Sequence, residues 1–338
     1  MSGVASKSVR LDWPTDATPA GKELEKRLAR AAETSWARFG KRVTFYLPGM
    51  IRNGRERGRY PALSLSGTRC DLLCDHCRGE LLKPMIDAST PDLLYRKAQA
   101  LAKTGAEGFL LTGGSDHLGR INWEPFLDVI SRIREETGLI LSVHSGLLDY
   151  ATAAALKEAG VSQALVDVVG DEKTLEQVLH LRDGMGRLLQ TLEAIEQAGL
   201  EFVPHVVAGV DYGDIRGEHR ALEIISGFSP HCLVFVVLFP FANTPMSRVN
   251  PPGPYEIAEL FAYARELMPH VEQSLGCERL RGQEGYVLET LALTAGINRM
   301  AVQSDRAAAR AAEMGLEIHY RKTCCSQPLF SKQELFQE

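Results

Sequence analysis

The feature that most constrains the fold of this chain is a regular alternation of short apolar runs with longer amphipathic stretches. The apolar runs are rich in Val, Leu, Ile and Phe, as buried strands are: 62–66, 108–113, 139–144, 164–169, 202–209 and 233–240. The stretches between them have helical periodicity, and several end in glycine, a common helix stop. Strands that alternate with helices form right-handed βαβ units and a parallel sheet. More than five units are present, so we predict an α/β fold, a (β/α) barrel or partial barrel, rather than a small doubly wound sheet.

The remaining segments extend this organisation at both ends. Helical periodicity over residues 22–39 predicts an N-terminal helical extension, which we place at 1–42. Two weaker strand units at 271–276 and 298–303 would complete a barrel over 43–304. Residues 305–338 then form a C-terminal segment, whose apolar stretch is expected to bring two adjacent cysteines back toward the barrel.

Composition and charge favour an ordinary globular protein. The 338 residues are 45% hydrophobic and 24% charged, with a net charge of -5 that gives no reason to expect binding to nucleic acid. The first residues contain no apolar signal core, and no apolar run approaches the ~20 residues that cross a bilayer. We therefore expect a cytoplasmic protein that does not enter a membrane. The arginine-rich run 51–60 is either a solvated loop or a basic rim for an acidic partner or anionic cofactor.

Three of the seven cysteines, Cys70, Cys74 and Cys77, follow the first predicted strand within one short loop. An odd number of cysteines in a protein of a reducing compartment indicates metal binding or chemistry rather than a disulfide framework. Loops that follow the strands of a β/α fold converge on one face, where such folds carry their chemistry. The close spacing of the three cysteines and their place after a strand together predict a functional site. Unrelated buried thiols would show neither this spacing nor this placement.

Two kinds of metal site are compatible with three clustered thiols. A structural zinc site is closed by four ligands. His76 could be the fourth, but it lies between Cys74 and Cys77 and cannot readily bend back onto the same metal. A [4Fe–4S] cluster held by three thiolates leaves one iron open to an exogenous ligand, such as the amino and carboxylate groups of S-adenosylmethionine.

The C-x3-C-x2-C spacing after the first strand of a β/α barrel resembles the signature of the radical S-adenosylmethionine superfamily. The resemblance implies a [4Fe–4S] cluster, S-adenosylmethionine and an external electron donor. It also implies a 5′-deoxyadenosyl radical that removes hydrogen from an unactivated carbon. The superfamily usually has an aromatic residue before the third cysteine, packed on the adenine. This chain has His76 there, and an imidazole can still stack.

The resemblance also implies cofactor contacts in the loop after the second predicted strand. Gly113, Gly114 and Ser115 match a Gly-Gly-Glu stretch that presents backbone groups to the methionyl ammonium, where glycine allows close approach. The acid is replaced by serine in this chain, and Asp116 follows one position later. The alternative is an ordinary glycine-rich turn.

Further implied contacts follow the later strands. Asp167 and Asp171 resemble the polar residues that biotin-synthase-like enzymes direct to the ribose hydroxyls and the amino group, although Asp171 could equally cap a helix. Gly209 matches the segment that borders the adenine, and His205 is either a contact there or a core histidine. Residues 238–246 resemble the sixth-strand segment of the same enzymes, so the resemblance covers 62–246.

A second group of cysteines lies near the end of the chain. Cys277 follows the seventh predicted strand, and Cys324 and Cys325 lie in the C-terminal segment. We predict that these three meet and carry an auxiliary iron–sulfur cluster. The alternative is that Cys277 is a packing residue and the adjacent pair is inert. Cys232 begins an apolar strand and is predicted to belong to the core.

Within the superfamily the chain is similar to biotin-synthase-like proteins, and among these to the subunits of the two-component lipoyl synthase. The similar stretches are 167–171, 276–282, 295–304 and the terminal CCS. They imply sulfur insertion into an octanoyl chain on a lipoyl carrier protein or domain, together with a related partner subunit. Two alternatives remain: a radical enzyme of rearrangement or cofactor-maturation type that inserts no sulfur, and a non-catalytic iron–sulfur or zinc protein.

Two absences narrow these possibilities. The predicted strands 139–144, 164–169 and 202–209 contain no cysteine, which disfavours biotin synthase itself, since that enzyme holds its second cluster inside the barrel strands. Residues 1–69 contain no cysteine either, and single-chain lipoyl synthase has an N-terminal cysteine motif. A lipoyl synthase of this sequence would need a sacrificial cluster near its C-terminus.

Overall fold

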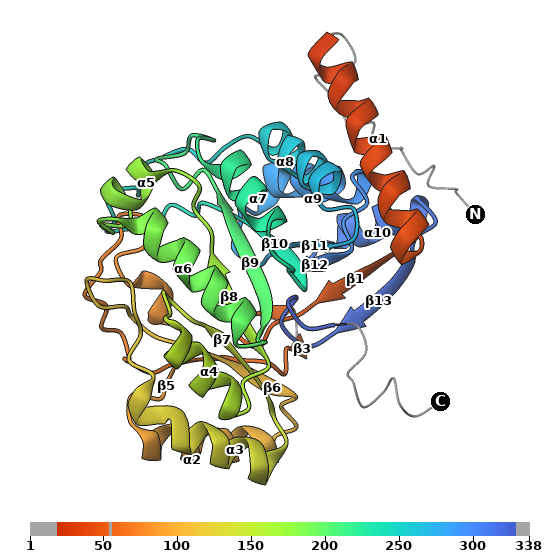
Figure 1. Cartoon of the computed structure of the whole chain (residues 1–338). Coiled ribbons are helices and arrows are strands. Elements are labelled where there is room, and N and C mark those ends of the chain that lie inside the picture. Colours follow the sequence, from red (N-terminus) through yellow and green to blue (C-terminus); the bar gives the residue numbers. More distant parts are fainter. Residues whose placement is uncertain (1–18, 54–55, 329–338) are drawn as a thin grey trace.

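The computed structural model describes residues 19–53 and 56–328 (Figure 1). Its centre is one sheet of 11 strands in the order β13-β1-β12-β11-β10-β9-β8-β7-β6-β4-β5, and each neighbouring pair runs parallel. The sheet curves into a barrel that stays open. Its two edge strands, β5 and β13, do not pair with each other, so the barrel is partial. The predicted α/β partial barrel is confirmed.

The strands coincide with the predicted apolar runs and add several elements. Their bounds are β1 (Arg42–Tyr46), β4 (Ala62–Ser64), β5 (Ile86–Asp87), β6 (Gly108–Thr112), β7 (Ile140–His144), β8 (Gln163–Asp167), β9 (Glu201–Ala208), β10 (Cys232–Val237), β11 (Glu272–Leu275), β12 (Arg299–Ala301) and β13 (Glu317–Arg321). A separate antiparallel hairpin is formed by β2 (Arg52–Asn53) and β3 (Glu56–Arg57). The central strands are buried almost throughout, as expected for a parallel sheet covered by helices.

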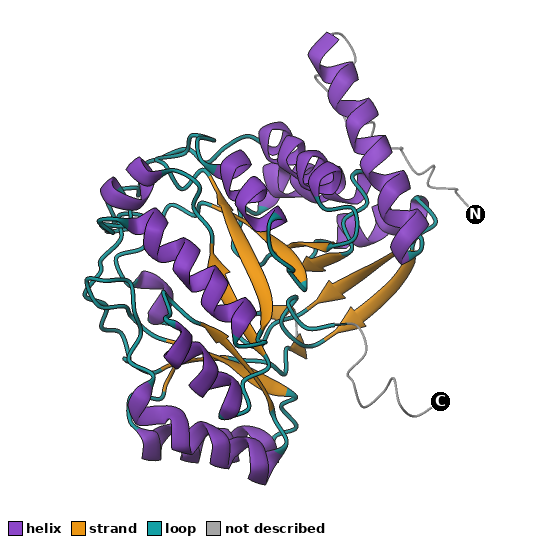
Figure 2. Ribbon diagram, viewed as in Figure 1, coloured by secondary structure: helices purple, strands orange, loops and turns teal. Residues whose placement is uncertain are grey.

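Helices cover the outer face of the sheet (Figure 2). They are α1 (Pro19–Phe39), α2 (Pro91–Lys103), α3 (Leu127–Thr137), α4 (Tyr150–Glu158), α5 (Glu172–Gln177), α6 (Gly184–Gln197), α7 (Glu218–Ser226), α8 (Pro254–Leu267), α9 (Gly282–Thr294) and α10 (Asp305–Glu313). Side chains that accept a backbone N–H begin several of them, including Thr90 at α2, Asp149 at α4 and Ser304 at α10. No helix in the described part of the chain combines the length and apolarity needed to cross a membrane.

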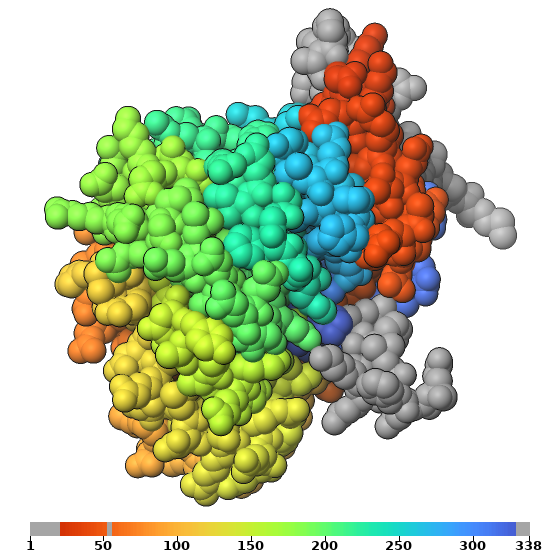
Figure 3. Space-filling view, viewed as in Figure 1, coloured from red at the N-terminus to blue at the C-terminus, as the bar shows by residue number. Residues whose placement is uncertain are grey.

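The predicted N-terminal helix is α1, which packs against α8 and α9. Arg27 on α1 donates to both carboxylate oxygens of Glu266 at 2.9 Å and also pairs with Glu259, so charged contacts hold the helix to α8. In the space-filling view α1 forms a ridge along one side of the molecule (Figure 3). The helix therefore belongs to the outer layer and leaves the barrel interior to other segments.

The interior of the barrel contains its own small core, separate from the layer between sheet and helices. It comprises Tyr46, Leu165, Val203, Cys232, Val234, Ala301 and Cys325. Cys232 is fully buried there, which confirms its predicted place in the core. Cys325 reaches this core because β13 pairs in parallel with β1 and the chain then turns inward. The last described residues thus fill the barrel from within.

Candidate active site

The three predicted cluster ligands lie on a loop, residues 66–79, that follows β4. Backbone contacts hold this loop against its neighbours: the amides of Asp71 and Leu72 both donate to the Ser115 carbonyl, at 2.9 and 3.1 Å. On the other side, the amide of Asp75 donates to the Val178 carbonyl at 2.9 Å. Leu73 has a φ of 49°, which places a sharp left-handed step inside the loop. We refer to residues 66–79 as the outer cysteine loop.

The structure brings Cys70, Cys74 and Cys77 together on the outer cysteine loop. Burial raises the pKa of Cys74 well above its usual value, and the neighbouring Cys77 and Cys70 raise it further. Burial likewise raises the pKa of Cys77 to about 11, and Cys70 adds to this shift. A cationic centre would stabilise the thiolate forms of Cys74 and Cys77 against these effects. The donor set therefore fits an iron–sulfur cluster.

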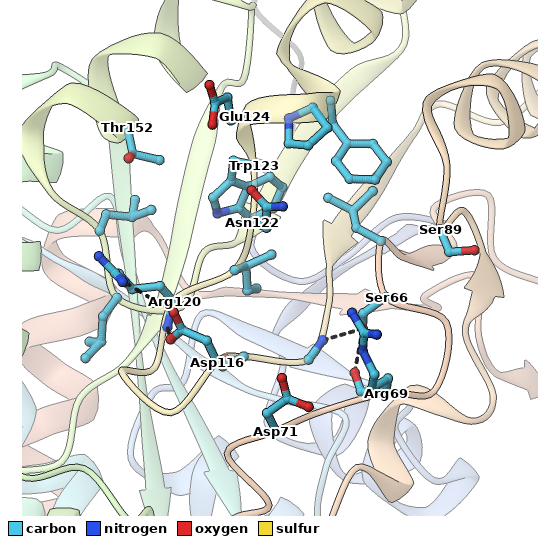
Figure 4. A pocket seen from close by; sticks show the side chains of 18 of the residues that line it. Ser66, Arg69, Asp71, Ser89, Asp116, Arg120, Asn122, Trp123, Glu124 and Thr152 are labelled. Atoms are coloured by element: carbon cyan, nitrogen blue, oxygen red, sulfur yellow. Dashed lines mark hydrogen bonds and ion pairs between the residues drawn. The ribbon is translucent and has the colours of Figure 1, made fainter.

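Gly113, Gly114 and Ser115 lie directly behind the outer cysteine loop. The amide of Gly114 donates to Ser66 Oγ at 2.7 Å (Figure 4). A Cβ on Gly114 would collide with the carbonyl oxygen of Arg69, so glycine is required there for the loop to approach β6. These contacts give the predicted cofactor segment a clear packing role, in addition to the cofactor contacts that the sequence predicts.

His76 points into the protein between two cluster ligands. Its Nδ1 is buried and, among the described residues, accepts or donates no hydrogen bond. Burial lowers the pKa of His76, with Asp167 and Asp75 acting in the opposite direction. A neutral imidazole with an unused buried nitrogen fits a position next to a bound group better than a solvated surface position.

Asp75, which the sequence analysis did not single out, ties three segments together at the outer cysteine loop. Its carboxylate accepts hydrogen bonds from Tyr212 Oη at 2.7 Å and from Arg78 at 2.9 Å, and lies 3.2 Å from His180 Nε2. Burial alone would raise the pKa of Asp75, but these three partners lower it. The sequence offers little indication of this role of Asp75, because Tyr212 and His180 are distant from it in the chain and lie in loops.

Asp167, at the end of β8, faces His144 from β7 and His205 from β9. His144 Nε2 lies 3.5 Å from Asp167 Oδ1, and the two imidazole rings are 5.4 Å apart. Burial would raise the pKa of Asp167, but the charge and hydrogen bond of His144, with smaller effects of His205 and His76, lower it to about 2. Burial and the neighbouring His144 lower the pKa of His205 to about 4. His144 was missed, although it occupies the same strand end as its two partners.

Asp171 and Gly209 have structural roles that are visible in the fold. Asp171 Oδ2 accepts hydrogen bonds from the amide and the hydroxyl of Thr174, both at 2.8 Å, so it caps α5 as the sequence alternative suggested. It also lies 3.4 Å from Arg216. Gly209 has a φ of 79°, and its amide donates to Glu218 Oε1 at 2.7 Å. A ribose or adenine contact by these residues stays a prediction.

Cys277, Cys324 and Cys325, which we call the inner cysteine group, meet inside the barrel. Hydrogen bonds from the Cys325 thiol and from Ser326 lower the pKa of Cys324 to about 6, against the effect of burial. Burial raises the pKa of Cys277 to about 11. The inner cysteine group therefore contains one thiol that is readily ionised among others that are not. Whether it holds a cluster stays a prediction.

The terminal segment, residues 322–328, is fastened at the opposite end of the barrel from the outer cysteine loop. Arg299 donates to the carbonyls of Cys325, Ser326 and Gln327 at 3.0 to 3.2 Å. The side-chain Nε2 of Gln327 donates to Gln163 Oε1 at 2.7 Å. Arg299 and Gln163 are the first residues of β12 and β8, so these contacts lie where the strands begin. The terminal segment thus closes that end of the barrel.

A cavity of about 620 Å³ lies beside the outer cysteine loop. It is lined by Ser66, Arg69 and Asp71 of the loop, by residues 120–126 and by the first turns of α2 and α4 (Figure 4). None of the three cluster thiols and none of His144, Asp167 and His205 lines it. The cavity is therefore distinct from the barrel interior.

Comparisons with known proteins agree with this arrangement. No family model matches the chain. The chain is 24% identical over 240 residues to the biotin synthase of Prochlorococcus marinus (68% of this chain, 71% of the relative) and 23% identical over 283 residues to that of Acaryochloris marina (80% and 74%). Its fold resembles methylornithine synthase, with a TM-score of 0.62 at 18% identity, covering 90% of this chain and 91% of that one. It also resembles a maturase of the FeFe-hydrogenase from Carboxydothermus hydrogenoformans, with a TM-score of 0.61 at 16% identity (88% and 72%).

The sequence is similar to biotin synthases over most of its length, and its partial barrel resembles the folds of these solved structures. A [4Fe–4S] cluster and S-adenosylmethionine stay predictions from the sequence, and the outer cysteine loop supplies three thiol donors that fit such a cluster. The narrower resemblance to a lipoyl synthase subunit finds no support among these relatives and stays a prediction.

Proposed function

We propose that this chain inserts sulfur into an unactivated carbon, with the octanoyl chain of a lipoyl carrier protein or domain as substrate and a related partner subunit. The observation that carries the proposal is the inner cysteine group, which lies inside the same barrel that carries the outer cysteine loop after β4. A radical enzyme that only rearranges its substrate has no need of thiols there. An external electron donor would complete the system.

The outer cysteine loop would hold the first cluster through Cys70, Cys74 and Cys77. When bound, this cluster and S-adenosylmethionine supply the one-electron chemistry that generates a radical able to remove hydrogen from carbon. The chain's own contribution is positioning. The Ser115 and Val178 carbonyls fix the loop from two sides, and His76 borders it with a free buried nitrogen.

The inner cysteine group would hold the second iron–sulfur cluster, the source of sulfur. Arg299 holds the terminal segment by three carbonyls, so the thiols of Cys324 and Cys325 keep a fixed place although they lie near the end of the chain. Buried neighbours exclude water, which protects a reactive intermediate from side reactions. The substrate carbon would have to lie between the two cysteine groups.

The proposal is tested by anaerobic reconstitution, followed by incubation with S-adenosylmethionine, a reductant and an octanoylated carrier peptide, with and without a candidate partner protein. We expect 5′-deoxyadenosine and a gain in peptide mass equal to added sulfur. Formation of 5′-deoxyadenosine with no mass gain under either condition would contradict sulfur insertion into this substrate. Absence of both products, and of a reducible cluster signal, would contradict the radical chemistry altogether.

A further inference from the structure

Three neighbouring strands each direct one metal-ligand side chain to the same point inside the barrel. His144 ends β7, Asp167 ends β8 and His205 lies on β9, where it is the direct register partner of Asp167. One ligand atom from each residue lies within 4.8 Å of those of the other two. Among the described residues these three make the only such group, and it shares no member with either cysteine group.

The orientation of His205 is fixed by a further contact. Its Nδ1 lies 3.2 Å from the carbonyl oxygen of Val203, and only 9% of the residue is exposed. A backbone carbonyl at Nδ1 favours the tautomer with the proton on that nitrogen, which leaves the Nε2 lone pair free. Metal-binding histidines are commonly held in this way by a second contact to the other ring nitrogen.

We propose that His144, Asp167 and His205 form a binding site for one divalent transition metal ion of the Zn²⁺ or Fe²⁺ class. Two imidazoles and one carboxylate are a donor set that such ions accept, whereas Mg²⁺ and Ca²⁺ prefer oxygen ligands alone. Three protein ligands leave coordination positions open for water or substrate. The site does not depend on the sulfur-insertion proposal. It uses Asp167 and His205, for which the sequence predicts cofactor contacts, so the metal ion is an alternative role for these two side chains.

The surroundings show what such an ion would face. Asp167 lies close enough to Cys74, Cys77 and His76 to affect each of them electrostatically, and His144 is coupled in the same way to Cys324. The ion would therefore have thiols of both cysteine groups within electrostatic reach. An ion at that place can act as a Lewis acid that binds a carbonyl or carboxylate oxygen and so orients a substrate in the barrel.

The test is a metal titration of the full-length chain after anaerobic reconstitution, when thiols that hold clusters are occupied. We expect calorimetry to show about one equivalent of tightly bound Zn²⁺, with affinity falling at least ~100-fold in His144→Ala and in His205→Ala, because loss of a direct ligand should exceed the loss of a supporting contact. Co²⁺ bound in place of Zn²⁺ should show visible bands of nitrogen and oxygen ligation without intense sulfur charge transfer. The matched control is His219→Ala on α7, whose ring packs on Tyr263 outside the barrel and whose removal should leave binding unchanged.

Two further measurements distinguish loss of metal binding from misfolding and from loss of the radical reaction. His205→Gln and Asp167→Asn keep the side-chain volume, and circular dichroism should show wild-type secondary structure while Zn²⁺ binding is lost. Equal Zn²⁺ affinity in wild type and all four site variants, or a Co²⁺ spectrum dominated by sulfur, would overturn the proposal. No bound Zn²⁺ in the wild type would show that His144 and Asp167 form an ion pair only. Assay of 5′-deoxyadenosine on the same samples, without added metal, reports on the radical chemistry independently.

Discussion

The outer cysteine loop and the inner cysteine group are built in opposite ways. The outer thiols lie within eight positions of one loop, and backbone hydrogen bonds to the segments after β6 and α5 hold that loop. The inner thiols come from segments 47 residues apart, Cys277 after β11 and Cys324 after β13. Their meeting depends on the addition of β13 to the sheet and on Arg299.

The two groups also differ in the ionisation of their thiols. Burial raises the pKa of Cys74 and Cys77, whereas hydrogen bonds from Cys325 and Ser326 lower the pKa of Cys324. Cys74 and Cys77, whose pKa values are raised, need the positive charge of a metal centre to become ligands. A lowered pKa favours the thiolate form of Cys324, which is the nucleophilic form of a cysteine. The comparison suggests a permanent centre at the loop and a reactive centre inside the barrel.

The largest effect is expected from Cys74→Ala, which removes the most buried thiol of the outer loop. The variant should lose about four irons per chain, because two remaining thiolates cannot retain the cubane. Formation of 5′-deoxyadenosine should fall to background while the inner group keeps its iron. Iron analysis and chromatography of the nucleoside measure both. Full retention of iron and activity would show that Cys74 does not hold a cluster.

Cys324→Ala should have the reverse effect. Sulfur insertion and the iron of the inner group should be lost. Formation of 5′-deoxyadenosine should stay within ~3-fold of wild type, because a single contact removed at a distance should change the activation free energy of that step by less than about 1 kcal/mol. Cys232→Ala is the matched control, because Cys232 is a fully buried thiol of the same interior core. Loss of iron in the control and not in Cys324→Ala would assign the ligand to Cys232 instead.

Arg299→Met tests whether the terminal segment positions the inner group. The substitution leaves Glu272 without its ion-pair partner and three carbonyls without a donor, so we expect a loss of about 3–5 kcal/mol in the free energy of unfolding, measured with urea. Arg310→Ala breaks an exposed pair with Glu313 and should cost less than about 1 kcal/mol. Equal, small losses in both variants would show that the terminal segment is held by other contacts.

The smallest effect is expected from Asp171→Ala, which removes the cap of α5. The cost should be about 1 kcal/mol of stability. Because α5 leads into the Val178 and Leu179 carbonyls that contact the outer loop, iron should be lost faster from the outer cluster on exposure to a chelator. The inner cluster should keep its wild-type rate. Faster loss from both clusters would indicate a general effect on the barrel.

The same differences explain which parts of the structure could be predicted from the sequence. The strand and helix pattern predicted the partial barrel, because buried parallel strands have continuous apolar runs. The outer thiols were recognisable because all their ligands lie on one short loop. The inner group was predicted only in outline, since its geometry depends on β1 and β13 pairing, and neither was predicted as a strand. His144 was missed because one histidine at a strand end is uninformative until Asp167 and His205 lie beside it.

The most direct test of the account follows the sulfur atom. The chain is reconstituted with heavy-isotope sulfide, and the mass of the octanoylated carrier peptide is measured after one round of reaction with S-adenosylmethionine, reductant and the candidate partner. The account predicts heavy sulfur in the peptide with the wild type and none with Cys324→Ala, while both form 5′-deoxyadenosine. A peptide that gains only unlabelled sulfur, or labelled sulfur with Cys324→Ala as well, would contradict the inner cysteine group as the sulfur source.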